Sequence, residues 1–247
     1  MKESNLFTVL GVLLITILIN LTACKKEEAN PNTATNPCQT NTTTVFEEKD
    51  GLIVIESEKL PTAEGWQLES AVTGFTGTAY MQWHGDNNFN TTGQGLITYQ
   101  IRVNTPGTYR IQWHCRINEG NDRTEANDAW LRLANATDFY AIPKNANSPK
   151  YYPHGSGKSP NPRGSGKEGW FKVYTTIVGD WTWRTFTNDD VNCNIFADFA
   201  AAGDYTVEIS GRSKGFAIDR IVFYKDDSVQ ENIATDLNAL TSNTICQ

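Results

Sequence analysis

Short segments that alternate apolar and polar residues follow one another between residues 51 and 225, and this pattern constrains the fold more than any other feature. Alternation with a period of two places every second side chain on the same face of a strand. Strand signals at such spacing, with turn residues between them, indicate an all-β fold, an antiparallel β-sandwich of the jelly-roll type. The segments expected to form strands are 52–58, 66–72, 79–83, 96–103, 108–117, 130–134, 171–175, 181–187, 194–199, 205–210 and 216–224.

Composition and net charge indicate a globular protein that does not bind nucleic acid. The chain has 247 residues, of which 39% are hydrophobic, so it can bury a full core. Its net charge of −7 argues against a broad basic surface, and no nucleic acid is expected as a partner. The only helix expected is a short one with an apolar stripe in 229–240.

The N-terminal residues are typical of a targeting signal and not of a folded element. An apolar run at 6–21 is short for a membrane span and typical of a signal peptide. The run ends in Leu-Thr-Ala-Cys at 21–24, which resembles a bacterial lipobox and makes Cys24 the lipidated first residue of the mature chain. We therefore expect a signal peptide at 1–23, a disordered tether at 24–45, a β-sandwich domain at 46–226 and a C-terminal tail at 227–247. An uncleaved anchor helix or ordinary secretion is the alternative.

The four residues after Cys24 are Lys-Lys-Glu-Glu. They look like the export signal that some bacteria use to place lipoproteins on the surface of the outer membrane, although a solvated charged linker has the same composition. A lipid-anchored, surface-exposed protein of the outer membrane is the expectation, in contact with the membrane through its lipid only.

The sequence carries no catalytic signature. The segment 155–159 (GSGKS) superficially matches a phosphate-binding loop, but Tyr152 stands where that motif needs glycine, and two prolines follow. Neither a GxSxG nucleophile turn nor the common zinc spacings HExxH and CxxC occur. We expect a protein that is not an enzyme.

Four patterned pieces resemble one family. They are IESE at 55–58, PGTYR at 106–110, AGDY at 202–205 and GFAIDRIV at 215–222. Together they resemble the galactose-binding-like β-sandwich, in particular carbohydrate-binding modules of families six and thirty-five, over residues 50 to 226. The resemblance implies a polysaccharide as the partner.

The resemblance also implies a structural calcium ion, held in that family by the first-strand carboxylates and the last-strand aspartate. The matching residues are Glu56, Glu58 and Asp219. Two carboxylates on one face of a strand repel each other unless a cation lies between them, and calcium prefers hard oxygen ligands. The alternatives are an exposed acidic face or an ion pair with Arg220.

In the family, loops at one end of the sandwich hold the sugar. An aromatic ring stacks on the apolar face of the sugar while polar groups bond its hydroxyls. Trp181 and Trp183 resemble the segment that supplies such a ring, with the first expected at the loop and the second buried; packing of both in the core is the alternative. The remaining candidate ligand-binding residues are Arg116, Asn118, Asp122, Asn127, Asp128, Arg212, Lys214 and Phe216.

The cations among these candidates suit a sulfate or a uronate, so an acidic glycan is one expectation. Pairing of these cations with neighbouring acids is the other. Ala217 stands where many family members carry a sugar-binding asparagine, which is a departure from the family pattern.

Four cysteines remain after Cys24, and three pairings are open to them. Cys38 and Cys246 flank the domain on its two tails, and domain termini are often close, so this pairing is favoured. Cys115 lies in an expected strand and Cys193 directly precedes one, so a bond between them is only weakly favoured over two buried free thiols.

The leading hypothesis is a surface lipoprotein that binds a polysaccharide without catalysis and works beside other surface glycan-utilisation proteins. One alternative is a small polysaccharide lyase or hydrolase that uses Tyr151, Tyr152 or His154 of the long segment 138–169. Another is an adhesion or structural lipoprotein.

Overall fold

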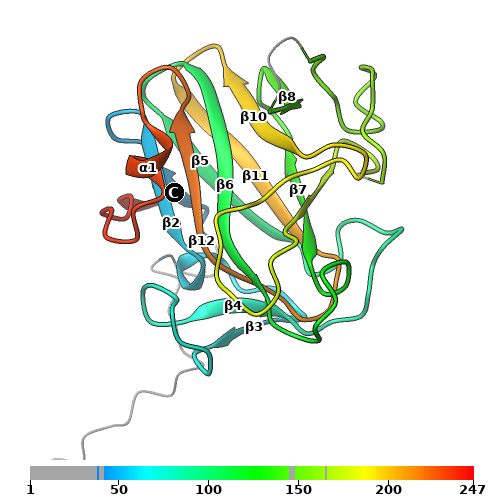
Figure 1. Cartoon of the computed structure of the whole chain (residues 1–247). Coiled ribbons are helices and arrows are strands. Elements are labelled where there is room, and N and C mark those ends of the chain that lie inside the picture. Colours follow the sequence, from blue (N-terminus) through cyan, green and yellow to red (C-terminus); the bar gives the residue numbers. More distant parts are fainter. Residues whose placement is uncertain (1–37, 39–41, 145–147, 165) are drawn as a thin grey trace, which may run out of the picture. The chain divides into compact units, whose positions relative to one another are not determined.

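The protein is described from a computed structural model, which covers residues 38, 42–144, 148–164 and 166–247. It is a β-sandwich, as the alternating pattern predicts (Figure 1). The strands are β1 (Thr44–Glu47), β2 (Leu52–Glu56), β3 (Trp66–Glu69), β4 (Tyr80–Trp83), β5 (Ile97–Val103), β6 (Gly107–Ile117), β7 (Asp128–Leu133), β8 (Asp138–Pro143), β9 (Phe171–Tyr174), β10 (Cys193–Phe199), β11 (Gly203–Gly211), β12 (Phe216–Lys225) and β13 (Thr244–Cys246).

Two sheets face each other. Sheet A has the strand order β13-β1-β5-β11-β7-β9, and sheet B has the order β3-β4-β12-β6-β10-β8, with β2 also paired to β12. The pairs are antiparallel except that β1 runs parallel to β5.

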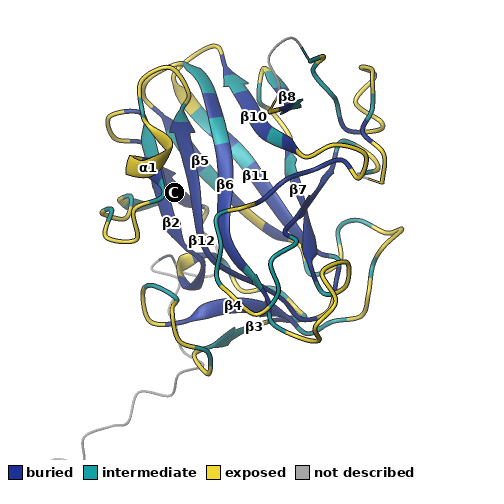
Figure 2. Cartoon of the chain, viewed as in Figure 1, coloured by how far each residue is buried: buried dark blue, intermediate teal, exposed yellow. Residues whose placement is uncertain are grey.

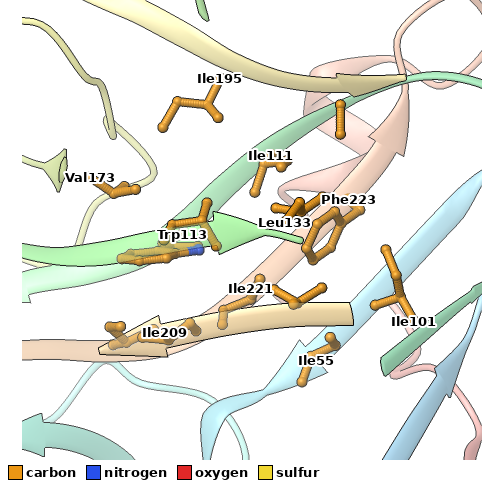
Figure 3. Close-up of a cluster of buried hydrophobic side chains, with 14 of the residues drawn as sticks. Ile55, Ile101, Ile111, Trp113, Leu133, Val173, Ile195, Ile209, Ile221 and Phe223 are labelled. Atoms are coloured by element: carbon orange, nitrogen blue, oxygen red, sulfur yellow. The ribbon is translucent and has the colours of Figure 1, made fainter. Parts of the chain in front are cut away.

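The core lies between the sheets and follows from the alternation along each strand. In β6, Tyr109, Ile111, Trp113 and Cys115 belong to the central hydrophobic cluster. Figure 3 shows side chains from both sheets meeting there, including Trp113 and Ile209. Burying these rings and branched chains supplies the main driving force for folding.

The outward-facing side of sheet B is covered as well, which the alternation alone does not predict. Gln112 and His114 of β6 point away from the core but are only 3% and 4% exposed. The segment 175–187 crosses over this face, where Cys115 and Thr182 form an isolated bridge (Figures 1 and 2). The sequence-based prediction of a regular strand at 181–187 is wrong, because this segment forms only isolated bridges, including the one between Thr182 and Cys115.

The C-terminal tail is an integral part of the sandwich. Its strand β13 pairs with β1, and a disulfide joins Cys38 to Cys246, the pairing that the sequence favours. Cys115 and Cys193 are buried free thiols. The expected tail helix is limited to α1 (Glu231–Ala234).

Three strands lie outside the sequence-based expectation. They are β1, which begins at Thr44 inside the expected tether, β8, which opens the segment expected to be a long loop, and β13 in the tail. Each is short or lies at a sheet edge, where the local signal is weak. Cys24 and the rest of 1–37 lie outside the described residues.

Candidate ligand-binding site

Four connecting segments meet at one end of the sandwich: 84–96, 118–127, 175–192 and 212–215. Backbone hydrogen bonds hold them together. Asn118 N donates to Gly215 O (3.0 Å), Ser213 N to Asp128 O (3.1 Å), and Thr175 N to Asn127 O (3.0 Å). Segments more than 80 residues apart in the sequence thus form one surface at this end.

A hollow of about 570 Å³ opens between these segments, and we call it the loop-end pocket. Its wall is mainly polar and charged, with two aromatic rings. The lining residues are Phe89, Arg123, Thr124, Asn127, Asp128, Lys172, Tyr174, Thr176, Asp189, Asn192 and Arg212.

A stacked arginine forms one side of the pocket. The guanidinium carbon of Arg212 lies 4.8 Å from the ring centre of Trp130 and 5.1 Å from that of Phe89. Arg212 also pairs with Asp128, whose side chain is only 2% exposed and whose other oxygen accepts a hydrogen bond from Ser213. The arginine is therefore held in place, while Phe89 keeps 49% of its surface exposed at the rim.

A second charged pair also lines the pocket. Lys172, which is 7% exposed, pairs with Asp189, and its ammonium lies 5.1 Å from the ring centre of Tyr174. The Tyr174 hydroxyl donates to Asn188 O (2.9 Å) or to Asn192 Oδ1 (2.8 Å). Burial raises the pKa of Tyr174 to about 12, so its hydroxyl remains a hydrogen-bond donor at neutral pH.

Charges in the pocket are nearly balanced. Arg212 and Lys172 each have a carboxylate partner, whereas Arg123 at the rim forms no salt bridge in the part of the chain that the structure describes. Fixed donors and acceptors beside an exposed ring suit a ligand with many hydroxyl groups.

Two residues with positive φ flank the pocket. Ala126, at φ 49°, precedes Asn127, and Asn188, at φ 73°, precedes Asp189. Asparagine tolerates this left-handed conformation, but alanine adopts it at a cost. The chain therefore accepts strain at a turn that positions pocket residues.

The expected sugar-binding residues are distributed over several environments. Asn127, Asp128 and Arg212 line the loop-end pocket. Lys214 and Asp122 are exposed but do not line it, and Asp122 accepts hydrogen bonds from Thr124 within its own turn. Phe216 is fully buried and packs 6.3 Å from Trp113, ring centre to ring centre, so its assignment to the site is wrong.

The other four expected residues lie on or beside the outward face of sheet B. The Arg116 Nε donates to Asn118 Oδ1 (3.0 Å). Trp181 and Trp183 both flank His114, with ring centres 5.5 Å and 5.0 Å from the imidazole. The Trp181 indole donates to Thr73 O (3.1 Å), and both tryptophans are half-buried. They therefore cover the sheet and do not line the loop-end pocket.

Sequence reasoning missed Phe89, Arg123, Lys172, Tyr174, Asp189 and Asn192. A signal for one of them was present, since Phe89 stands alone in a stretch rich in Asn, Thr and Gly. Such a stretch offers little apolar surface with which to bury a ring. Lys172 and Tyr174 lie in a strand, and only the pairing of β9 with β7 brings them to this end.

The expected calcium ligands each have partners from the protein. Glu56 pairs with Arg220 and accepts a hydrogen bond from Thr76 (2.8 Å). Asp219 lies at a β-bulge of β12, where its Oδ2 is 2.6 Å from His114 Nδ1. Glu58 lies in the turn 57–59 after β2, so it does not share a strand face with Glu56 as the sequence suggested.

The geometry agrees with the ion-pair alternative for Glu56. In 38, 42–144, 148–164 and 166–247, no group of three or more His, Cys, Asp or Glu side chains is arranged to hold a metal ion. A guanidinium already neutralises Glu56, so the residues present do not fit a calcium ion. The calcium ion implied by the resemblance remains an untested prediction, and the ion pair predicts instead that chelation has no effect on stability.

Solved structures similar to part of this chain include carbohydrate-binding modules, carbohydrate-active enzymes and a tryptic core variant of Cry1Da from Bacillus thuringiensis. The chain is similar to carbohydrate-binding modules of families 35 and 6. A family 35 module from Clostridium thermocellum is 11% identical with a TM-score of 0.35, covering 70% of this chain and 98% of that one. A family 6 module from Clostridium cellulolyticum, in complex with xylose, is 12% identical with a TM-score of 0.36, covering 70% and 96%.

A family 26 mannanase of Podospora anserina that carries a family 35 module is 16% identical, with a TM-score of 0.40 and 74% of this chain covered. The similarity spans only 29% of that enzyme. Neither a protein-family model nor the sequence of a curated protein matches the chain.

Proposed function

We propose that the protein binds a polysaccharide without catalysis and that the loop-end pocket holds the sugar. One observation carries the proposal: the exposed ring of Phe89 lies beside charged groups that are fixed before any ligand arrives. The axial C–H face of a pyranose is apolar and stacks on such a ring, while its hydroxyls need polar partners at the rim. Groups that are already fixed lose little entropy on binding.

An acidic or sulfated glycan is the finer part of the proposal. Arg123 supports it, because this rim cation has no carboxylate partner in the described ranges and leaves the pocket lining with one cation in excess. Arg212 and Lys172 do not add to it, because their charges are already neutralised. The attraction of an anionic sugar should therefore be modest and should weaken with salt.

We also propose that the protein is anchored to the outer membrane through a lipid on Cys24 and exposed at the cell surface, where it works beside other glycan-utilisation proteins. The support is the lipobox-like sequence and the charged residues after it. No helix in the described residues is long and apolar enough to span a membrane. Replacing Cys24 by Ser should abolish fatty-acid labelling, and a labelled mutant would overturn the anchor.

The experiment that tests the pocket compares three variants of the soluble form from residue 29 onward. The probes are laminarin as a neutral glucan, polygalacturonate as a uronate and carrageenan as a sulfated glycan. F89A should weaken binding of the preferred probe by about tenfold or more, the loss typical of one stacked ring. W181A tests the outward face of sheet B, and L240A is the control for an exposed apolar residue outside the pocket.

A loss in F89A with W181A and L240A unchanged supports the loop-end pocket. A loss in W181A alone moves the site to the tryptophans over His114, and no binding of any probe by the wild type contradicts the proposal. New reducing ends or unsaturated products from any probe would favour the lyase or hydrolase alternative, whose candidates Tyr151, Tyr152 and His154 do not line the pocket.

A further inference from the structure

A second hollow lies at the far end of β7, between the β7–β8 turn and the long segment 153–169. Its volume is about 490 Å³, and we call it the hairpin pocket. It is lined by polar, charged and apolar residues of β7, of β8 with the turn before it, and of the long segment. The lining residues are Arg132, Leu133, Ala134, Ala136, Thr137, Asp138, Phe139, Pro153, Ser156, Lys158, Glu168 and Gly169.

The two pockets lie along the same pair of strands. β7 pairs with β9 in the register Asp128 to Tyr174 and Leu131 to Phe171. Because side chains alternate, Asp128 and Arg132 emerge on the same outward face of sheet A. Four residues of strand separate their backbones by about 13 Å, so one extended ligand can reach both pockets.

The surface between the pockets is built from exposed contacts. Lys167 Nζ donates to Asn90 O (2.9 Å), and the Thr92 hydroxyl donates to a carboxylate oxygen of Glu168 (3.4 Å). These contacts join the segment 84–96, which carries Phe89, to the segment that forms the hairpin pocket. A ligand that leaves the loop-end pocket along β7 therefore passes over a surface rich in amide, hydroxyl and carboxylate groups.

The polar groups of the hairpin pocket are held in place like those of the loop-end pocket. Arg132 pairs with Glu208, and its guanidinium carbon lies 4.6 Å from the Trp170 ring centre. Lys158 pairs with Asp138 at 2.6 Å while 49% of its side chain stays exposed. The pocket thus offers donors and acceptors with remaining capacity, the chemistry that recognises hydroxyls.

The backbone around the hairpin pocket is also constrained. Glu168 has φ 55°, which is strained for a residue with a side chain. A β-carbon at Gly155 would lie 2.9 Å from Glu168 Cα, so the two parts of the long segment pack too closely for any larger residue. The parts of this segment around Gly155 and Glu168 therefore form a folded wall of the pocket.

We propose that the hairpin pocket is a second subsite for the same polysaccharide chain, so that the protein grips a chain interior across the surface that the segment 84–96 forms over β7. The proposal rests on the proposed function of the loop-end pocket. It assigns a role to the long segment that lines the hairpin pocket, which sugar binding in the loop-end pocket does not involve. It also gives a rule for the ligand: affinity must rise with chain length beyond what fills the loop-end pocket.

The test uses the disaccharide and the octasaccharide prepared from whichever panel polysaccharide binds, measured by isothermal titration calorimetry. The octasaccharide should bind wild type about tenfold more tightly than the disaccharide. K158A should remove most of that advantage and leave disaccharide affinity unchanged. K150A is the matched control, because Lys150 also lies within salt-bridge distance of Asp138 (3.6 Å) but does not line the hairpin pocket.

Hydrogen exchange provides a second measurement. The octasaccharide should protect backbone amides in 153–169, and the disaccharide should not. Equal affinity for both lengths, or equal loss in K158A and K150A, would overturn the second subsite while F89A still reports on the loop-end pocket. Absence of binding by both fragments and by the parent polysaccharide would overturn both proposals together.

Discussion

The buried pair between Arg220 and Glu56 gives the sharpest test of how the structure is held together. The two residues face each other in the β12–β2 ladder, and their side chains are 5% and 6% exposed. The guanidinium also donates to the carbonyls of Asp236 (3.2 Å) and Ala239 (3.4 Å), so it fastens the C-terminal tail to sheet B.

We expect R220M to cost about 3–5 kcal/mol of unfolding free energy, because it leaves a buried carboxylate without its counter-charge. For a domain of this size each kcal/mol lowers the melting temperature by about 2–4 °C, so the expected drop is about 6–20 °C. Urea unfolding followed by tryptophan fluorescence measures the free energy, and circular dichroism measures the melting temperature. Removing the charge of Glu56 as well, in E56Q/R220M, should recover about 1 kcal/mol or more.

Two outcomes would refute this reasoning. A cost of R220M below about 1 kcal/mol would mean that the pair behaves like an exposed one. A loss that appears only after treatment with a calcium chelator would mean that calcium, and not Arg220, neutralises Glu56. We expect the chelator to leave the melting temperature of wild type unchanged.

Three further predictions concern individual residues and the disulfide. Burial raises the pKa of Glu58, and its Oε2 has no hydrogen-bond partner, so the folded state binds the proton more tightly than the unfolded state and loses stability as pH rises above 4.5. E58Q should therefore be more stable than wild type at pH 7, and this gain should vanish as pH falls toward 4.5. An E58Q variant less stable than wild type at pH 7 would contradict this. C38S/C246S removes a disulfide between residues 208 apart and should lower the free energy of unfolding by up to about 5 kcal/mol in the chain-entropy estimate. Wild type treated with a thiol alkylator under native conditions should keep its melting temperature, because its free thiols, Cys115 and Cys193, are buried. Relief of the positive φ at Ala126 should make A126G about 1 kcal/mol more stable, and a destabilised A126G would show that the turn carries no strain.

The sequence by itself determined the fold class and most of the strands. Alternation in 108–117 places Tyr109, Ile111 and Trp113 on one face, and the β6 strand of the structure buries those residues. Such patterns are local, because the period of two follows from strand geometry alone. The flanking positions of Cys38 and Cys246 likewise favoured the pairing that the structure contains.

Only the tertiary structure decided which polar residues share a pocket. Asp128 and Arg212 are 84 residues apart, and their contact depends on the pairing of β7 with β11, which no local pattern encodes. Trp181 has the sequence appearance of a binding aromatic, yet the path of 175–187 across sheet B places it over His114. Phe89 has no strand pattern at all, and the fold leaves it exposed against Arg212. Side-chain alternation is a property of one strand, whereas a binding site is a property of the loops that several strands bring to one end.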